Sequence, residues 1–343
     1  MRVVSSRIAQ GLALASVALC AGAASAQAPY KVLDKWKLGG AGGWDYLLAD
    51  PIAHRLYITH GPRVEVVDEN TGKAIGAITG LKGTHGVVLD PDGKVGYISD
   101  GGANAVVVFD RQSFATLASI PTGTNPDGIA YEPVTKTVWA FNGRSNNVSV
   151  IDTKTRSVVA TIDVPGKPEF PHADGKGHVF DNIEDKNLVV EFDAHTNKLT
   201  QTLPLTGCDS PSGMSVDPAH HRLFSVCDGK KMTVVDTDSL KQIGSAEIGE
   251  GPDAAGYDAK NQLAFSSNGG DGTFSVVDAA HGYKTIEQLP TARGARTMAY
   301  DAAEDKAYVV TAEFGPRPEP TATNPRPRPA IVPDSFTVMV IGR

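Results

Sequence analysis

An all-β fold built from repeated four-stranded units is predicted by two regularities of the sequence. The first is an aspartate that closes an apolar strand and returns after gaps of 42, 42, 41, 43 and 42 residues, at Asp68, Asp110, Asp152, Asp193, Asp236 and Asp278. The second is a shorter apolar strand ending in an acid, found seven times, at Asp50, Asp90, Glu132, Asp174, Asp217, Asp258 and Asp301. A near-constant period of about 40 residues is typical of repeat folds and indicates seven units.

Each unit contains short strands separated by turn-forming residues. In residues 142–162, an Asn/Gly/Ser loop leads into the alternating strand 148–152, a polar turn, and a second strand at 158–162. This pattern fits an antiparallel meander, and no helical periodicity competes with it. Seven four-stranded sheets of this size predict a seven-bladed β-propeller. An open solenoid is the alternative, but it would leave two sheet edges exposed and usually carries capping units.

The two ends of the repeat region indicate how the ring of blades is completed. Residues 30–38 resemble the outermost strand of a unit, and residues 336–341 resemble a third strand with no fourth strand after it. We expect the N-terminal outer strand to pair with the C-terminal strand, which would remove a sheet edge. The last unit also contains a segment rich in proline and arginine, residues 313–334, which is predicted to be a loop inserted in the last blade.

Residues 1–26 have the features of a secretory signal peptide. Arg2 and Arg7 precede an apolar stretch, and Ala24-Ser25-Ala26 matches a small-x-small cleavage pattern. The stretch is short and interrupted for a membrane anchor. We therefore expect cleavage after Ala26 and a periplasmic or secreted protein with one domain, residues 27–343. We expect this protein to be a monomer without a membrane span.

The composition argues against nucleic acid as a partner and in favour of a disulfide. The whole chain has 32 basic and 39 acidic residues, and removal of Arg2 and Arg7 with the signal leaves a net charge of −9. An acidic chain makes nucleic acid an improbable partner, because phosphate contacts need Lys and Arg. The mature chain keeps two cysteines, Cys208 and Cys227. In an exported protein an even count favours a disulfide, and antiparallel topology puts both at the same end of adjacent strands.

Three segments of the third unit resemble the YVTN-repeat β-propeller family, the YncE-like exported proteins of bacteria: residues 139–142, 147–152 and 158–162. Residues 294–301, 311–318 and 324–336 are similar to one exported branch of that family. The resemblance covers essentially the whole mature chain. It implies the propeller fold, and it says little about activity because one scaffold hosts many functions.

Candidate ligand-binding residues lie in loops that a propeller brings together at one mouth of its central channel. Alignment on the closing acids places there Asp45, His85, Asp127, Asp253 and Arg296, with Glu169 or His172 in the fourth unit. The loops that leave the second strands lie at the same face and add His60, and Trp44, next to Asp45, is a further candidate. Convergent polar groups at a channel mouth are the usual signature of a ligand site. The competing explanation is that Asp and Asn in turns bond only to the local backbone.

The sequence leaves three functions open. The first is a non-catalytic exported protein that binds a small ligand, a peptide or an envelope partner at the channel mouth. The second is a metal-dependent hydrolase or lactonase at the same place, and the third is single-stranded nucleic-acid binding. Acids and imidazoles are compatible with a divalent metal cofactor. However, no HExxH, CxxC or EF-hand spacing indicates one, and no catalytic motif is present.

Overall fold

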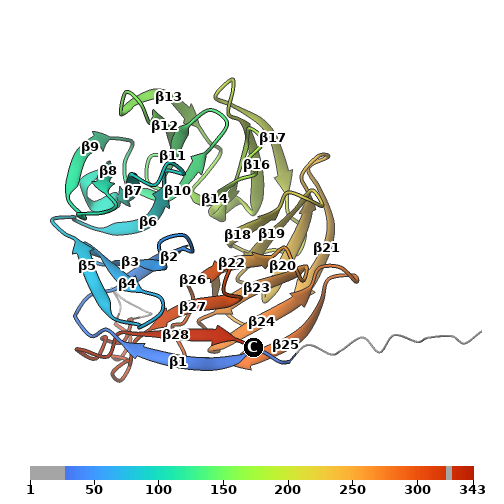
Figure 1. Cartoon of the computed structure of the whole chain (residues 1–343). Helices are drawn as coiled ribbons and strands as arrows, with labels where there is room; N and C mark the ends of the chain where they lie inside the picture. Colours follow the sequence, from blue (N-terminus) through green and yellow to red (C-terminus); the bar gives the residue numbers. More distant parts are fainter. Residues whose placement is uncertain (1–27, 322–326) are drawn as a thin grey trace, which may run out of the picture.

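Seven four-stranded antiparallel sheets surround a central channel in the computed structural model, which describes residues 28–321 and 327–343 (Figure 1). The predicted all-β, seven-bladed propeller is confirmed. Within the described residues the only helices are two short 3-10 turns, η1 (Gly101–Ala103) and η2 (Glu184–Lys186). None of the described helices is long and apolar enough to cross a membrane. The predicted signal peptide lies outside the described residues.

The first four blades follow the chain without interruption, each with its inner strand first. Blade one holds β2 (Trp44–Asp50), β3 (Arg55–His60), β4 (Arg63–Asp68) and β5 (Ala74–Ile78). Blade two holds β6 (Thr84–Leu89), β7 (Val95–Asp100), β8 (Ala105–Asp110) and β9 (Thr116–Pro121). Blade three holds β10 (Pro126–Glu132), β11 (Thr137–Asn142), β12 (Asn147–Asp152) and β13 (Ser157–Asp163). Blade four holds β14 (Pro168–Ala173), β15 (His178–Ile183), β16 (Leu188–Asp193) and β17 (Lys198–Pro204).

The last three blades include the one sheet made from both ends of the chain. Blade five holds β18 (Pro211–Asp217), β19 (Arg222–Cys227), β20 (Lys231–Asp236) and β21 (Lys241–Glu247). Blade six holds β22 (Pro252–Asp258), β23 (Leu263–Asn268), β24 (Thr273–Asp278) and β25 (Lys284–Pro290). Blade seven holds β26 (Met298–Asp301), β27 (Lys306–Thr311), β28 (Thr337–Gly342) and, as its outer strand, β1 (Lys31–Lys37).

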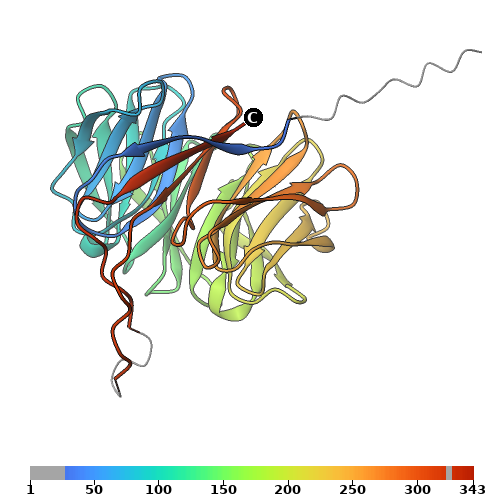
Figure 2. The ribbon, with the colours of Figure 1, turned by 90° about the horizontal axis from the view of Figure 1, so that it is seen from below.

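The outer strand of blade seven comes from the N-terminus. β1 lies beside β28 (Figure 2) and pairs with it antiparallel. Val32 is opposite Ile341 in this pairing. Just before β1, the ring of Tyr30 is buried and meets the ring of Phe265 of blade six edge-on, with centroids 5.4 Å apart. The N-terminal segment therefore contacts two blades, one through its backbone and the other through an aromatic side chain.

The hydrophobic core lies between neighbouring blades. Trp139 and Phe141 of blade three pack against Phe192 of blade four, with ring centroids 5.6 and 5.8 Å apart. All three side chains are fully buried. Large rings fill the wedge between twisted sheets, which is why each blade is stabilised mainly by the next one.

The aspartates that set the period are turn residues. Asp152 ends β12, and its Oδ1 accepts hydrogen bonds from the backbone N–H of Thr155, at 2.6 Å, and from its hydroxyl, at 2.9 Å. Asp68 and Asp110 make the same contacts with Thr71 and Ser113. The repeated acid therefore fixes the turn to the outer strand and has a structural role.

The residue after the turn aspartate is a base in blade two and a buried acid in blade one. Arg111 follows the turn aspartate of blade two and pairs with buried Asp50 of blade one. Glu69 occupies the equivalent position of blade one, is 4% exposed, and neither of its carboxylate oxygens has a hydrogen-bond partner in the described structure. Burial, and then the charge of Asp301, raise the pKa of Glu69 to about 8.

Glu69→Gln is therefore expected to change how stability depends on pH. Because the folded pKa is raised above the unfolded one, the folded protein holds a proton that the unfolded chain releases, and stability falls as pH rises from about 4.5 to about 8. Above that range Gln should stabilise the protein by roughly 1–3 kcal/mol, and at pH 4 it should be nearly neutral. Denaturant unfolding of the unaltered protein and the variant, at pH 4 and at a pH above 8, measures this difference in stability. Exposed Glu247→Gln is the control, and an equal gain at both pH values would contradict the prediction.

Two further predicted features can be located in the fold. Cys208, before β18, and Cys227, at the end of β19, form a disulfide with their Cα atoms 5.3 Å apart.

The proline- and arginine-rich segment lies between β27 and β28, and its described parts project from one face of the ring (Figure 2). Its two limbs are bridged at Phe314 and Ile331. This face is the one that carries the candidate site.

Candidate functional site

One residue from each blade faces the channel mouth from an equivalent position. In six blades it is the second residue of the inner strand, and in blade seven it lies two residues before β26. These seven residues, here called the mouth ring, are Asp45, His85, Asp127, Glu169, Ser212, Asp253 and Arg296. In blades three to six a proline precedes the ring residue and starts the strand, where a missing N–H does no harm.

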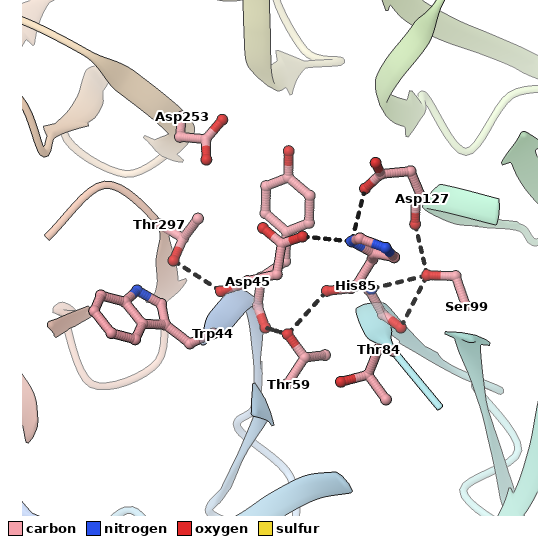
Figure 3. Close-up of polar contacts among 12 residues, drawn as sticks. Trp44, Asp45, Thr59, Thr84, His85, Ser99, Asp127, Asp253 and Thr297 are labelled. Carbon is pink, nitrogen blue, oxygen red and sulfur yellow. Dashed lines mark hydrogen bonds and ion pairs between the residues drawn. The ribbon is translucent and has the colours of Figure 1, made fainter. Parts of the chain in front are cut away.

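Five members of the mouth ring form a chain of alternating acids and bases. Asp253 accepts a hydrogen bond from Arg296 Nε at 2.6 Å, and a second nitrogen of Arg296 lies 3.5 Å from Asp45 Oδ1. The other oxygen of Asp45 lies 2.6 Å from His85 Nδ1, which is also 3.3 Å from Asp127 Oδ1 (Figure 3). Blades six, seven, one, two and three are thus linked across the mouth.

The fourth carboxylate of the ring has a different base. Glu169 lies 2.8 Å from the ammonium group of Lys167, which also pairs with Glu184. Lys167 is two residues before Glu169, so one loop supplies both charges of this pair. Acids exceed bases in the mouth ring and its immediate partners, and the site favours cations.

The ring groups have strongly perturbed pKa values. Burial, the largest cause, raises the pKa of Asp127 to about 7, that of Glu169 to about 8 and that of Asp253 to about 6. Neighbouring carboxylates add to these increases, and His85, Lys167 and Arg296 oppose them. Burial lowers the pKa of His85, but the hydrogen bond to Asp45 and the surrounding negative charges outweigh it and raise the pKa to about 9. Perturbed groups gathered in a cavity are typical of functional sites.

A belt of hydrogen bonds below the mouth ring fixes its backbone. The hydroxyl of Thr59 in blade one donates to the carbonyl of His85 in blade two, and that of Ser99 in blade two donates to the carbonyl of Asp127 in blade three (Figure 3). The same kind of contact crosses four of the other five seams, from Asn182 to Ser212, from Ser212 to Pro252, from Ser267 to Arg296 and from Thr297 to Asp45. Five ring residues, Asp45, His85, Asp127, Ser212 and Arg296, are thereby held at their carbonyls from the neighbouring blade, which preorganises the site.

The mouth ring opens into a polar cavity of about 810 Å³. Asp45, Asp127, Glu169 and Asp253 line its floor, together with Lys167 and Arg296. Its rim includes Arg293 and two arginines of the loop between β27 and β28, Arg317 and Arg328. The cavity therefore has an acid-rich floor below a rim of guanidinium groups.

Three predicted site residues lie elsewhere or serve another purpose. Trp44 lines the cavity, but its ring is buried against Phe336, with centroids 5.4 Å apart, and supports the base of the loop. His60 is fully buried and stacks on the same Phe336 at 4.1 Å, so it is not part of the cavity lining. His172 lines a cavity at the opposite mouth, where burial lowers its pKa. In blade four the ring residue is therefore Glu169.

The opposite mouth has a mainly apolar cavity of about 580 Å³ that shares no lining residue with the first. Leu47, Ile129 and Phe170 are among its walls. Tyr46 and Phe170 each follow a mouth-ring residue along their strands, and their rings meet edge-on with centroids 4.7 Å apart. This pair joins blades one and four across the channel, between the acidic ring and the apolar cavity.

Comparison with known proteins identifies the fold. No family model matches the sequence, and no curated protein matches it either. Among solved structures, a chain of the hydrazine synthase of Kuenenia stuttgartiensis is similar, with a TM-score of 0.70 and 16% sequence identity over 78% of this chain and 92% of that one. At this identity the likeness shows the propeller fold alone. The resemblance to the YVTN-repeat family stays a prediction.

Proposed function

We propose that this protein is an exported, non-catalytic propeller of the YVTN-repeat kind that binds a small zwitterionic ligand or a short peptide in the channel-mouth cavity. The observation that carries the proposal is the division of charge within one cavity. Carboxylates of the mouth ring form the floor, and Arg293, Arg317 and Arg328 stand at the rim. A cavity of about 810 Å³ falls in the usual size range of small-ligand sites.

The two charged ends of the ligand would meet complementary groups. An ammonium group fits the floor, where Asp127 and Glu169 are largely withdrawn from water and the four carboxylates of the mouth ring outnumber the three bases beside them. A carboxylate fits the rim, since guanidinium groups bind carboxylates in a bidentate manner. The disulfide and the predicted signal peptide support an extracytoplasmic location.

Trialanine is a suitable probe, because it is small and has one charge of each sign. We expect calorimetric titration of the chelator-treated protein at pH 7.5 to show binding of free trialanine. Acetylation of its amine or amidation of its carboxylate should each weaken binding at least tenfold, since each removes one charged contact. Affinity should rise from pH 5.5 to pH 7.5 as Asp127, with a pKa of about 7, loses its proton and Glu169, with a pKa of about 8, begins to lose its own.

Matched variants locate the site of binding. Glu169→Gln should weaken trialanine binding and flatten its pH dependence, whereas Asp238→Asn, at an exposed acid outside the mouth ring, should leave both unchanged. Binding that is indifferent to blocking of either peptide end would contradict the proposed charge division. Absence of heat at millimolar trialanine would contradict the ligand class.

A further inference from the structure

We infer that Asp45, His85 and Asp127 form a binding site for one divalent transition-metal ion of the zinc type. A ring nitrogen of His85 and one carboxylate oxygen from each aspartate lie within 4.8 Å of one another. In the described residues this is the one group of three or more such side chains that lies close enough to hold an ion. The proposal is independent of the ligand class proposed above.

The donor set identifies the kind of ion. One imidazole nitrogen and two carboxylate oxygens suit zinc and its neighbours, whereas calcium takes six to eight oxygen ligands. Catalytic zinc sites commonly have three protein ligands and leave the remaining position to water or substrate. Asp45 and Asp127 both line the mouth cavity, so the open side of the proposed site faces it.

The three ligands come from equivalent positions of three successive blades and are held before any ion arrives. The backbone carbonyls of Asp45, His85 and Asp127 accept hydrogen bonds from Thr297, Thr59 and Ser99, at 2.8, 3.0 and 2.5 Å (Figure 3). Arg296 adds a contact to the outer oxygen of Asp45. Such outer contacts orient metal ligands and contribute substantially to affinity.

Other histidine–aspartate pairs lack this convergence. His281 lies 3.0 Å from Asp278, and His221 lies 2.7 Å from Asp238, but both pairs are exposed, and neither is joined by a further ligand-type side chain to make a group of three. These pairs serve as controls, because each has an imidazole and a carboxylate but no third ligand in reach of the same ion. The contrast also shows that proximity of one His and one Asp is not the basis of the proposal.

Metal binding can be measured directly on untagged protein stripped with a chelator. We expect calorimetry with Zn²⁺ to give one equivalent per chain with a micromolar or lower dissociation constant, confirmed by elemental analysis after gel filtration. His85→Ala should weaken the affinity at least tenfold, and Asp45→Asn with Asp127→Asn should remove binding. His281→Ala should bind zinc like the unaltered protein. Co²⁺ should give the d–d absorption bands of a nitrogen/oxygen site, without thiolate charge transfer.

The possible results separate the proposal from its alternatives. Less than about one-fifth of an equivalent of zinc, or equal affinity in the unaltered protein and His85→Ala, would overturn it. Thermal melting of each variant in the presence of a chelator shows whether that variant folds. If His85→Ala does not fold, Asp127→Asn alone, which keeps the side-chain shape, decides the matter by the same tenfold criterion. Trialanine binding is measured without metal, so the two proposals succeed or fail separately.

Discussion

Removal of residues 28–38 is expected to abolish the folded monomer. β1 supplies the fourth strand of blade seven, and its loss leaves the outer edge of β28 without a partner over residues 337–342, while the other edge stays paired with β27. Each backbone hydrogen bond contributes about 1 kcal/mol, and the buried ring of Tyr30 would be lost as well. The total is comparable with the roughly 5–15 kcal/mol that stabilises a typical domain.

Gel filtration and circular dichroism test this prediction. The shortened chain should elute as aggregate, because an exposed strand edge pairs with other chains. A synthetic peptide of residues 28–38, added during refolding, should restore monomer by occupying the vacant edge. As a control, the same peptide with Tyr30 and Trp36 replaced by Ser should be less effective, since both rings pack against the core clusters. A stable monomeric truncated chain with unchanged melting behaviour would show that β1 is dispensable.

Loss of the disulfide is the second large effect we expect. Cys208→Ala with Cys227→Ala should lower the stability by about 3 kcal/mol, the chain-entropy value for a loop of this length, and the melting temperature by about 5–10 °C. Both cysteines are buried in the core between blades four and five, among side chains such as Phe180 and Met214, so small cavities add to the loss.

Reductant provides the internal control for the disulfide. Dithiothreitol should lower the stability of the unaltered protein to nearly that of the double variant, which itself should not respond to reductant. Denaturant unfolding followed by fluorescence measures both. If reduction leaves the midpoint of the unaltered protein unchanged while mass spectrometry shows both thiols free, the bridge does not have the stabilising role assigned to it.

The repeat could be predicted from the sequence because its signals are local. Each turn aspartate forms hydrogen bonds with residues within three positions of itself, as Asp152 does with Thr155. The spacing of these aspartates can therefore be recognised in the sequence before the fold is known. Counting back from the closing acids selects Asp45, His85, Asp127 and Arg296, four residues that the structure brings into contact. Blade four was ambiguous because its first turn is shorter, and only the observed strand pairing selects Glu169 over His172.

The remaining features depend on contacts between blades. His60 ends β3 at the same level as the site, but its side chain points into the seam and stacks on Phe336, a residue 276 positions away. The hydroxyl belt was missed for a similar reason, since Thr59 and Ser99 bond to carbonyls in the following blade. The only signal of these contacts in the sequence is a small hydroxyl residue one position before the end of three second strands, at Thr59, Ser99 and Ser267.

The edge-on contact between Tyr46 and Phe170 bears on how a ligand could reach either cavity. This pair lies between the two cavities, which share no lining residue, so each cavity is reached from its own face of the ring. A ligand in the acidic cavity would therefore lie beside Arg317 and Arg328 of the loop between β27 and β28, which line the same cavity. An apolar compound in the opposite cavity would bind without contacting that loop.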